Sequence, residues 1–148
     1  MKTIQGDLLD IERGILVHQV NLLGIMGGGI AFQIANKWPA LHRAYKELFR
    51  TGSLELGGVF FFSINPGLIV ANLAGQESIG GIATRYEAYD KALPEINAMA
   101  ESVGLPVYFP KNIGCGLAGG DWSIMEPILE KYCPEATLVE FNPAAIAA

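Results

Sequence analysis

Two glycine-rich segments contain the residues best suited to bind a ligand. Residues 24–29 read Gly-Ile-Met-Gly-Gly-Gly, and residues 114–120 read Gly-Cys-Gly-Leu-Ala-Gly-Gly. Each segment follows an apolar run typical of a strand and precedes a pattern typical of a helix. Backbone N–H groups in such a loop, together with the positive end of the following helix, favour phosphate binding. We call these segments the first and second glycine loops.

The glycine loops contain no basic side chain. Lysine and arginine are absent between Arg13 and Lys37, and again between Lys111 and Lys131. An anion bound there would therefore be held by backbone N–H groups and helix N-termini. This pattern predicts a small polyanionic ligand such as a phosphate ester.

Composition narrows the class of protein. The 148 residues are 51% hydrophobic and 17% charged, which indicates a compact domain; we expect it over residues 1–142, with 143–148 as a flexible tail. The net charge of -5 and the lack of a basic run make bulk nucleic acid an unfavourable partner. The two cysteines have no metal-ligand spacing, so no metal, cofactor or disulfide is expected. With no leader or membrane span in view, we expect a cytoplasmic protein that does not bind membranes.

Strand-like runs alternate with helical patterns along the chain. Strands are predicted at residues 2–5, 15–20, 57–63, 67–72, 106–110 and 137–141, and helices at 29–37, 39–52, 84–104 and 121–132. Asn65-Pro66 predicts a hairpin turn, and Thr84-x-x-Glu87 has the form of a capping box. Pro94 should kink its helix. This order predicts an α/β domain with three α/β/α layers and a mixed central sheet.

Four polar side chains stand near the expected loops. Asp7 follows the first strand, where it could cap a turn or accept a hydrogen bond from the amine of a base. Asn21 lies at a strand end beside the first glycine loop. His18 lies inside an apolar strand, where a core role is common, but its strand leads into that loop. Asp121 could both cap a helix and place a carboxylate at the mouth of the second glycine loop.

Two nucleotide-binding motifs are not supported. Gly114-x-Gly116-x-x-Gly119 matches the dinucleotide fingerprint, yet only one strand follows it, whereas a Rossmann domain needs several βα units after this loop. The sequence contains no GxxxxGK[ST] motif either. The glycine loops can still bind phosphate through backbone N–H groups, although the chain fits neither the Rossmann nor the P-loop family.

Three segments in order resemble a macrodomain. They are Gly6-Asp7-Leu8, residues 17–31 and residues 113–122, and the resemblance covers residues 2–142. Within this family, the sequence is similar to the branch that contains ADP-ribose-1''-phosphate phosphatases and small ADP-ribosyl-ester hydrolases. The resemblance implies ADP-ribose or a derivative as ligand, with Asp7 and Leu8 at the adenine and Asn21 at the distal ribose. It also implies phosphate contacts from Gly24, Gly27, Gly28, Gly29, Ile30 and Ala31, and from Gly114, Cys115, Gly116, Leu117, Ala118 and Gly119.

The sequence departs from this family at positions that matter for catalysis. Hydrolases of this branch that remove ADP-ribose from acidic side chains or from DNA are similar in that they carry a lysine after the second hairpin strand. Residues 69–83 contain no lysine, and Gln76 stands near that place. Glutamine cannot form a Schiff base with an opened ribose. Ala118 likewise stands where the hydrolase of this branch that acts on acidic side chains of proteins has an acidic residue.

Three functions remain as hypotheses. The first is hydrolysis of ADP-ribose-1''-phosphate to ADP-ribose and phosphate, with His18 or Asp121 as the catalytic residue that transfers the proton or activates water. The second is an ADP-ribosyl hydrolase that acts without a catalytic lysine. The third is a non-catalytic module that binds ADP-ribose or ADP-ribosylated molecules.

Overall fold

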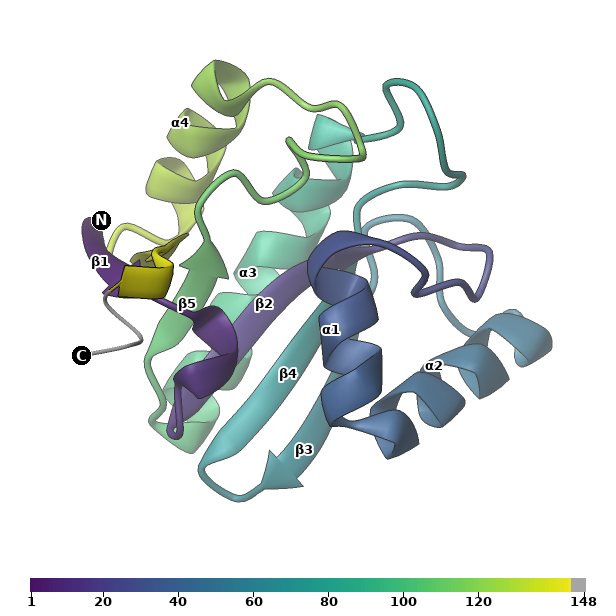
Figure 1. The fold of residues 1–148 in the computed structure, drawn as a ribbon, viewed down its shortest axis with the longest axis horizontal. Helices are drawn as coiled ribbons and strands as arrows, with labels where there is room; N and C mark the ends of the chain where they lie inside the picture. Colours follow the sequence, from purple (N-terminus) through teal and green to yellow (C-terminus); the bar gives the residue numbers. More distant parts are fainter. Residues whose placement is uncertain (145–148) are drawn as a thin grey trace.

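A computed structural model describes residues 1–144, which form a six-stranded sheet with helices on both faces (Figure 1). The described elements are β1 (Lys2–Gly6), the 3-10 helix η1 (Leu8–Asp10), β2 (Gly14–Val20), α1 (Gly29–Lys37), α2 (Pro39–Thr51), β3 (Val59–Asn65), β4 (Leu68–Ala74), α3 (Tyr86–Val103), β5 (Val107–Pro110), α4 (Trp122–Tyr132) and β6 (Thr137–Phe141). The predicted strands and helices are confirmed within a few residues at each end.

The sheet is mixed, as predicted. Its strand order is β1-β6-β5-β2-β4-β3, and every neighbouring pair is parallel except β3 and β4. The antiparallel pair is the expected hairpin, whose turn is closed by a 2.9 Å hydrogen bond from the Gly67 N–H to the side chain of Asn65. The parallel strands therefore end at one common edge of the sheet.

Each face of the sheet buries its own apolar cluster. Helices α1 and α2 cover the face nearer the viewer in Figure 1, where Ile34 and Leu41 pack against Val20 and Val70. Helices α3 and α4 cover the opposite face with buried side chains that include Leu93, Ile96, Met125 and Leu129. Side chains of a strand alternate between the two faces of the sheet. Because helices cover both faces, β2 and β4 are buried almost throughout. The three-layer prediction is confirmed.

One local prediction needs correction, and one short element was not predicted. The expected capping box at Thr84 is wrong, because the Thr84 hydroxyl donates to the Gly114 carbonyl (2.5 Å) and Arg85 occupies the N-cap without a side-chain cap. The short helix η1 has no apolar period from which it could be predicted, and Asp7 caps it by accepting a 2.9 Å hydrogen bond from the Leu9 N–H. Helix α3 continues through Pro94 as one helix.

The last described residues lie beside the end of β1. The Asn142 N–H donates to the Gly6 carbonyl, and the Asn142 side chain accepts from the Ala144 N–H. Of the tail expected at 143–148, residues 145–148 lie outside the described residues. None of the helices within residues 1–144 has both the length and the apolar character that a membrane span requires.

The topology brings the two glycine loops together. Strands β2 and β5 are parallel neighbours, yet β2 leads to α1 on one face and β5 leads to α4 on the other. Adjacent parallel strands whose connections diverge in this way leave a crevice at their carboxyl ends, where α/β proteins bind ligands. The first glycine loop follows β2 and the second follows β5, so both border this crevice.

Candidate functional site

A cleft lies between the glycine loops at the carboxyl edge of the sheet. It has a proximal compartment of about 360 Å³, which extends to Asp7, Leu8 and Phe141, and a distal compartment of about 500 Å³, which extends to Asn21 and Ile79. Both compartments share six lining residues, which are Gln19, Gly28, Ala31, Gln76, Leu117 and Ala118. The two compartments are therefore neighbouring parts of one cleft between the loops.

Leu117 connects the two glycine loops. A side chain at Gly28 would place its Cβ 2.7 Å from Leu117 Cδ1, so the first loop approaches Leu117 as closely as a glycine allows. The Leu117 side chain is nevertheless 77% exposed. It lines both compartments without being buried in the core, which suits contact with a bound molecule.

Both loops contain backbone N–H groups that have no hydrogen-bond partner in the described residues. Within residues 1–144, no hydrogen bond is made by the N–H groups of Gly29, Ile30 and Ala31 in the first turn of α1, whose N-cap Gly28 provides no side-chain cap. The N–H groups of Gly116, Leu117 and Ala118 in the second loop also have no partner among the residues that the structure describes. All six of these residues line the proximal compartment. Backbone donors of both glycine loops are therefore available along one wall of the cleft.

The proximal end contains the cleft's charged side chains. Asp7 lines it while capping η1, so the capping role is observed and the carboxylate still borders the cleft. Lys111 also lines it, but its ammonium pairs with Glu140 at 2.6 Å, which raises the pKa of Lys111. Because that charge is already paired, the described lining offers no free cation to a phosphate.

Asn21 shapes the first glycine loop as well as lining the distal compartment. Its Oδ1 accepts hydrogen bonds from the Leu23 N–H (3.0 Å) and the Tyr45 hydroxyl (2.7 Å). Its Nδ2 donates to the Ile25 carbonyl (2.8 Å). The side chain is 7% exposed, so Asn21 holds the loop in shape and presents little surface of its own to a ligand.

His18 is placed inside the sheet, away from the cleft. Its side chain is fully buried, lines neither compartment, and bonds Asn72 Oδ1 through Nε2 at 2.6 Å. Burial lowers the pKa of His18 to about 4. The structure does not bring His18 to the loops, because side chains alternate along β2 and the neighbouring Gln19 is the one that faces the cleft.

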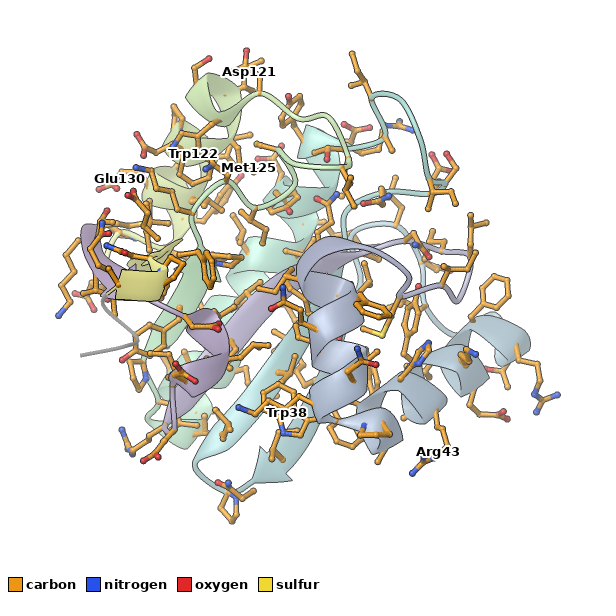
Figure 2. All side chains as sticks on the ribbon, viewed as in Figure 1. Trp38, Arg43, Asp121, Trp122, Met125 and Glu130 are labelled. Carbon is orange, nitrogen blue, oxygen red and sulfur yellow. The ribbon has the colours of Figure 1, made fainter. Side chains whose placement is uncertain are left out.

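Asp121 also lies outside the lining of the cleft. Figure 2 shows it at the beginning of α4, where its carboxylate accepts hydrogen bonds from the Ser123 N–H and hydroxyl. These bonds lower the pKa of Asp121. It is an exposed N-cap, so the structural role considered for this residue is observed and the catalytic one has no support from its position.

Three other expected ligand residues support the loops without lining the cleft. Gly24 packs against the Phe49 ring, Cys115 donates its thiol to the Ile113 carbonyl, and Gly119 lies against the Gly81 carbonyl. The remaining expected residues line one or both compartments, namely Asp7, Leu8, Asn21, Gly27, Gly28, Gly29, Ile30, Ala31, Gly114, Gly116, Leu117 and Ala118.

Gln19 is a cleft residue that the sequence analysis did not identify. It lines both compartments, and its amide bonds Gln76, Thr84 and Tyr89. Its position directly after His18 in a predicted strand could have revealed it, since alternation places one of the two on each face. Val139 and Phe141, also missed, complete the proximal wall from β6.

Comparison with known proteins identifies the fold. No family model matches the chain. A DNA ADP-ribosyl glycohydrolase of Mycobacterium tuberculosis is 27% identical across 94% of the chain, which spans 41% of that relative's length. An ADP-ribose 1''-phosphate phosphatase of Aspergillus oryzae is 46% identical over 46 residues, covering 30% of this chain and 23% of that protein. The chain therefore spans less than half the length of these curated relatives.

Solved structures match over nearly the whole chain. A protein from Bacteroides thetaiotaomicron superposes with a TM-score of 0.86 at 30% identity, covering 95% of this chain and 97% of that one. A macrodomain protein from Streptomyces coelicolor gives a TM-score of 0.78 at 28% identity, covering 95% and 97%. Thermosipho africanus DarTG, solved in complex with ADP-ribose, gives 0.80 at 18% identity, covering 97% of this chain and 42% of that one. This chain therefore has the macrodomain fold.

Proposed function

We propose that the chain binds ADP-ribose along the cleft and hydrolyses ADP-ribose-1''-phosphate at its distal end. The adenine would lie by Asp7 and Leu8, the pyrophosphate between the glycine loops, and the distal ribose in the compartment of Asn21. The observation that carries this proposal is the set of free N–H groups on both loops along one cleft. A pyrophosphate is the ligand group that such donors match best.

The lining of the distal compartment favours a phosphomonoester. Its described polar side chains are the amides of Gln19, Asn21 and Gln76, with no carboxylate, imidazole, thiol or ammonium among them. Amide and backbone donors can orient a phosphate and offset its charge. Water would attack phosphorus, the bond between phosphorus and the ribose oxygen would break, and the water proton would pass to the leaving oxygen through the phosphate itself. No protein lysine enters this reaction.

A second function is supported by the comparisons. The relative named DNA ADP-ribosyl glycohydrolase matches across 94% of the chain, whereas the phosphatase matches over 46 residues. Removal of an ADP-ribosyl group would have to proceed without a lysine, because residues 69–83 contain none. Binding without chemistry is supported by the positions of His18 and Asp121, which lie outside the cleft.

Three measurements distinguish these functions. We expect calorimetry to show binding of ADP-ribose, and phosphate release from ADP-ribose-1''-phosphate to exceed release of ADP-ribose from modified DNA. Binding without either release would support the non-catalytic module. Absence of ADP-ribose binding would contradict all three functions.

A substitution at Asp7 tests the placement of the adenine. Asp7→Asn keeps an oxygen to cap η1 but removes the charge that would accept from the adenine amine, so we expect affinity for ADP-ribose to fall about tenfold. Asp10→Asn is the matched control, because Asp10 is exposed on the same 3-10 turn and does not line the cleft. Equal affinities of the two variants in calorimetry would place the base elsewhere.

A further inference from the structure

Gln19 is held by hydrogen bonds at both ends of its amide. Its Oε1 accepts from the Tyr89 hydroxyl at 2.6 Å. Its Nε2 donates to Gln76 Oε1 at 2.8 Å and to Thr84 Oγ1 at 3.0 Å. Gly75 and Gly114 leave room for this amide, since a Cβ at either would lie within 2.7 Å of Gln19 Oε1.

The partners of Gln19 allow only one orientation of its amide. The Thr84 hydroxyl proton is used on the Gly114 carbonyl, so Thr84 Oγ1 must accept from Gln19. Complete burial raises the pKa of Tyr89 well above its usual value, so its hydroxyl stays protonated and donates. Gln19 must therefore direct its nitrogen toward Gln76.

This arrangement determines what Gln76 presents to the cleft. Because Gln76 Oε1 accepts from Gln19, its nitrogen points the other way and donates one N–H to the Ser78 carbonyl at 2.7 Å. The second N–H of Gln76 has no partner within residues 1–144. Gln76 is half-buried and lines both compartments, so this donor lies where a bound ligand would pass.

We propose that Gln76, positioned by Gln19, donates an amide N–H to an anionic substituent in the distal compartment and makes the site prefer ligands that carry a phosphate there. The proposal rests on the proposed function, in which the 1'' phosphate occupies that compartment. Gln76 is the residue that contacts the ligand, and Gln19 acts through it. A freely rotating glutamine could turn its oxygen toward the phosphate, and the bond from Gln19 opposes that rotation.

The test measures the preference between two ligands. Calorimetry gives Kd for ADP-ribose and for ADP-ribose-1''-phosphate, with KM from phosphate release where the second ligand is turned over. Gln76→Met keeps the size of the side chain and removes the donor, so we expect the preference for the phosphorylated ligand to fall about tenfold. Gln19→Met should reduce it by a similar factor, and the double variant should lose no more than the larger single loss.

Gln33→Met is the matched control. Gln33 also lines the proximal compartment, but its side chain makes no hydrogen bond in the described residues, so its replacement should leave the ratio of the two Kd values unchanged. Thermal unfolding checks that each variant folds. If Gln19→Met does not fold, Gln76→Met alone decides, because Gln76 lies in a partly exposed loop.

The failures of the two proposals are distinguishable. An unchanged preference in Gln76→Met, or a wild-type protein that binds both ligands equally, would overturn the role of Gln76 and leave ADP-ribose binding intact. A wild-type protein that binds neither ligand would overturn the proposed function and this inference with it.

Discussion

His18 and Asn72 form a polar pair inside an otherwise apolar part of the sheet. They are direct neighbours in the register of β2 and β4, and both side chains are fully buried. The Asn72 Nδ2 donates to the Phe60 carbonyl, so Asn72 Oδ1 is the acceptor and His18 Nε2 carries the proton. His18 Nδ1 has no partner in the described residues. The imidazole is therefore neutral, and its role is to join two strands.

The buried imidazole predicts a pH dependence of stability. Burial lowers the pKa of His18 from 6.5 to about 4, so as the pH falls through this window the unfolded chain takes up a proton that the folded chain does not. Stability is thus full above pH 6.5 and decreases toward pH 4, by on the order of 3 kcal/mol from this residue. Urea unfolding of the wild type and of His18→Gln across this range should show the smaller decrease in the variant.

The same variant separates structure from catalysis. Glutamine can donate to Asn72 without titrating, so His18→Gln should fold and should bind ADP-ribose with unchanged affinity at neutral pH. If the free energy of unfolding fell equally with pH in the wild type and in His18→Gln, the role assigned to His18 in stability would be wrong. A large loss of phosphate release in a folded His18→Gln protein would restore this residue as a catalytic candidate.

The second glycine loop depends on backbone contacts with the segment that follows β4. The Ala83 N–H donates to the Ala118 carbonyl at 2.8 Å, and a Cβ at Gly119 would lie 2.7 Å from the Gly81 carbonyl oxygen. Gly119 also has a φ of +73°, a conformation that disfavours other residues. Its glycine is required to keep this segment against the loop.

Gly119→Ala should therefore weaken ligand binding as well as stability. The added Cβ would push the loop from residues 81–82 and misplace its N–H donors, and we expect Kd for ADP-ribose to rise about tenfold or more. Gly104→Ala is the matched control, because Gly104 has a φ of +68° but nothing within 4 Å of a Cβ and lies after α3. Both variants should show lower Tm values, and only the first should bind ADP-ribose weakly in calorimetry. If Gly119→Ala and Gly104→Ala bound ADP-ribose with equal affinity, the second glycine loop would tolerate the added Cβ and this prediction would be wrong.

The helices and strands were predictable because their signals are local. Pro39 at the start of α2 and Gly52 after its end stand where helix punctuation requires them, and apolar runs marked the buried strands. The misread segment began at Thr84, whose hydroxyl bonds Gly114 thirty positions away. The hydrogen bonds of Gln19 could not be predicted for the same reason, since its partners Gln76, Thr84 and Tyr89 are far from it in the sequence. Long-range hydrogen bonds of this kind have no local pattern in the sequence.

The positions of the glycine loops beside the cleft could be predicted, but the positions of His18 and Asp121 outside it could not. The loops' lack of charge and their positions after strands follow from the sequence alone, and the fold places them at one edge. Whether His18 or Asp121 reaches the cleft depends on strand alternation and on the start of α4. A shift of one residue along β2 exchanges a buried histidine for the cleft-lining Gln19.

The whole molecule carries charge of the same sign as its proposed ligand. Its net charge is -5, and Lys111, the basic residue among the described residues that line the cleft, is paired with Glu140. Long-range electrostatics therefore oppose the approach of ADP-ribose, and short-range N–H donors must provide the attraction. The same charge disfavours docking of bulk DNA, whose binding ordinarily relies on lysine and arginine contacts.

This balance predicts how binding responds to salt. Added salt screens the repulsion between the protein and the ligand, while the N–H contacts inside the cleft are screened much less. Between about 50 mM and about 500 mM salt, the affinity for ADP-ribose should stay constant or rise, whereas a phosphate held by free lysines would lose affinity over this range. Calorimetry in sodium chloride at a series of concentrations measures this response. A fall in affinity of about tenfold or more would mean that cationic side chains hold the pyrophosphate, and it would contradict a site made of main-chain donors.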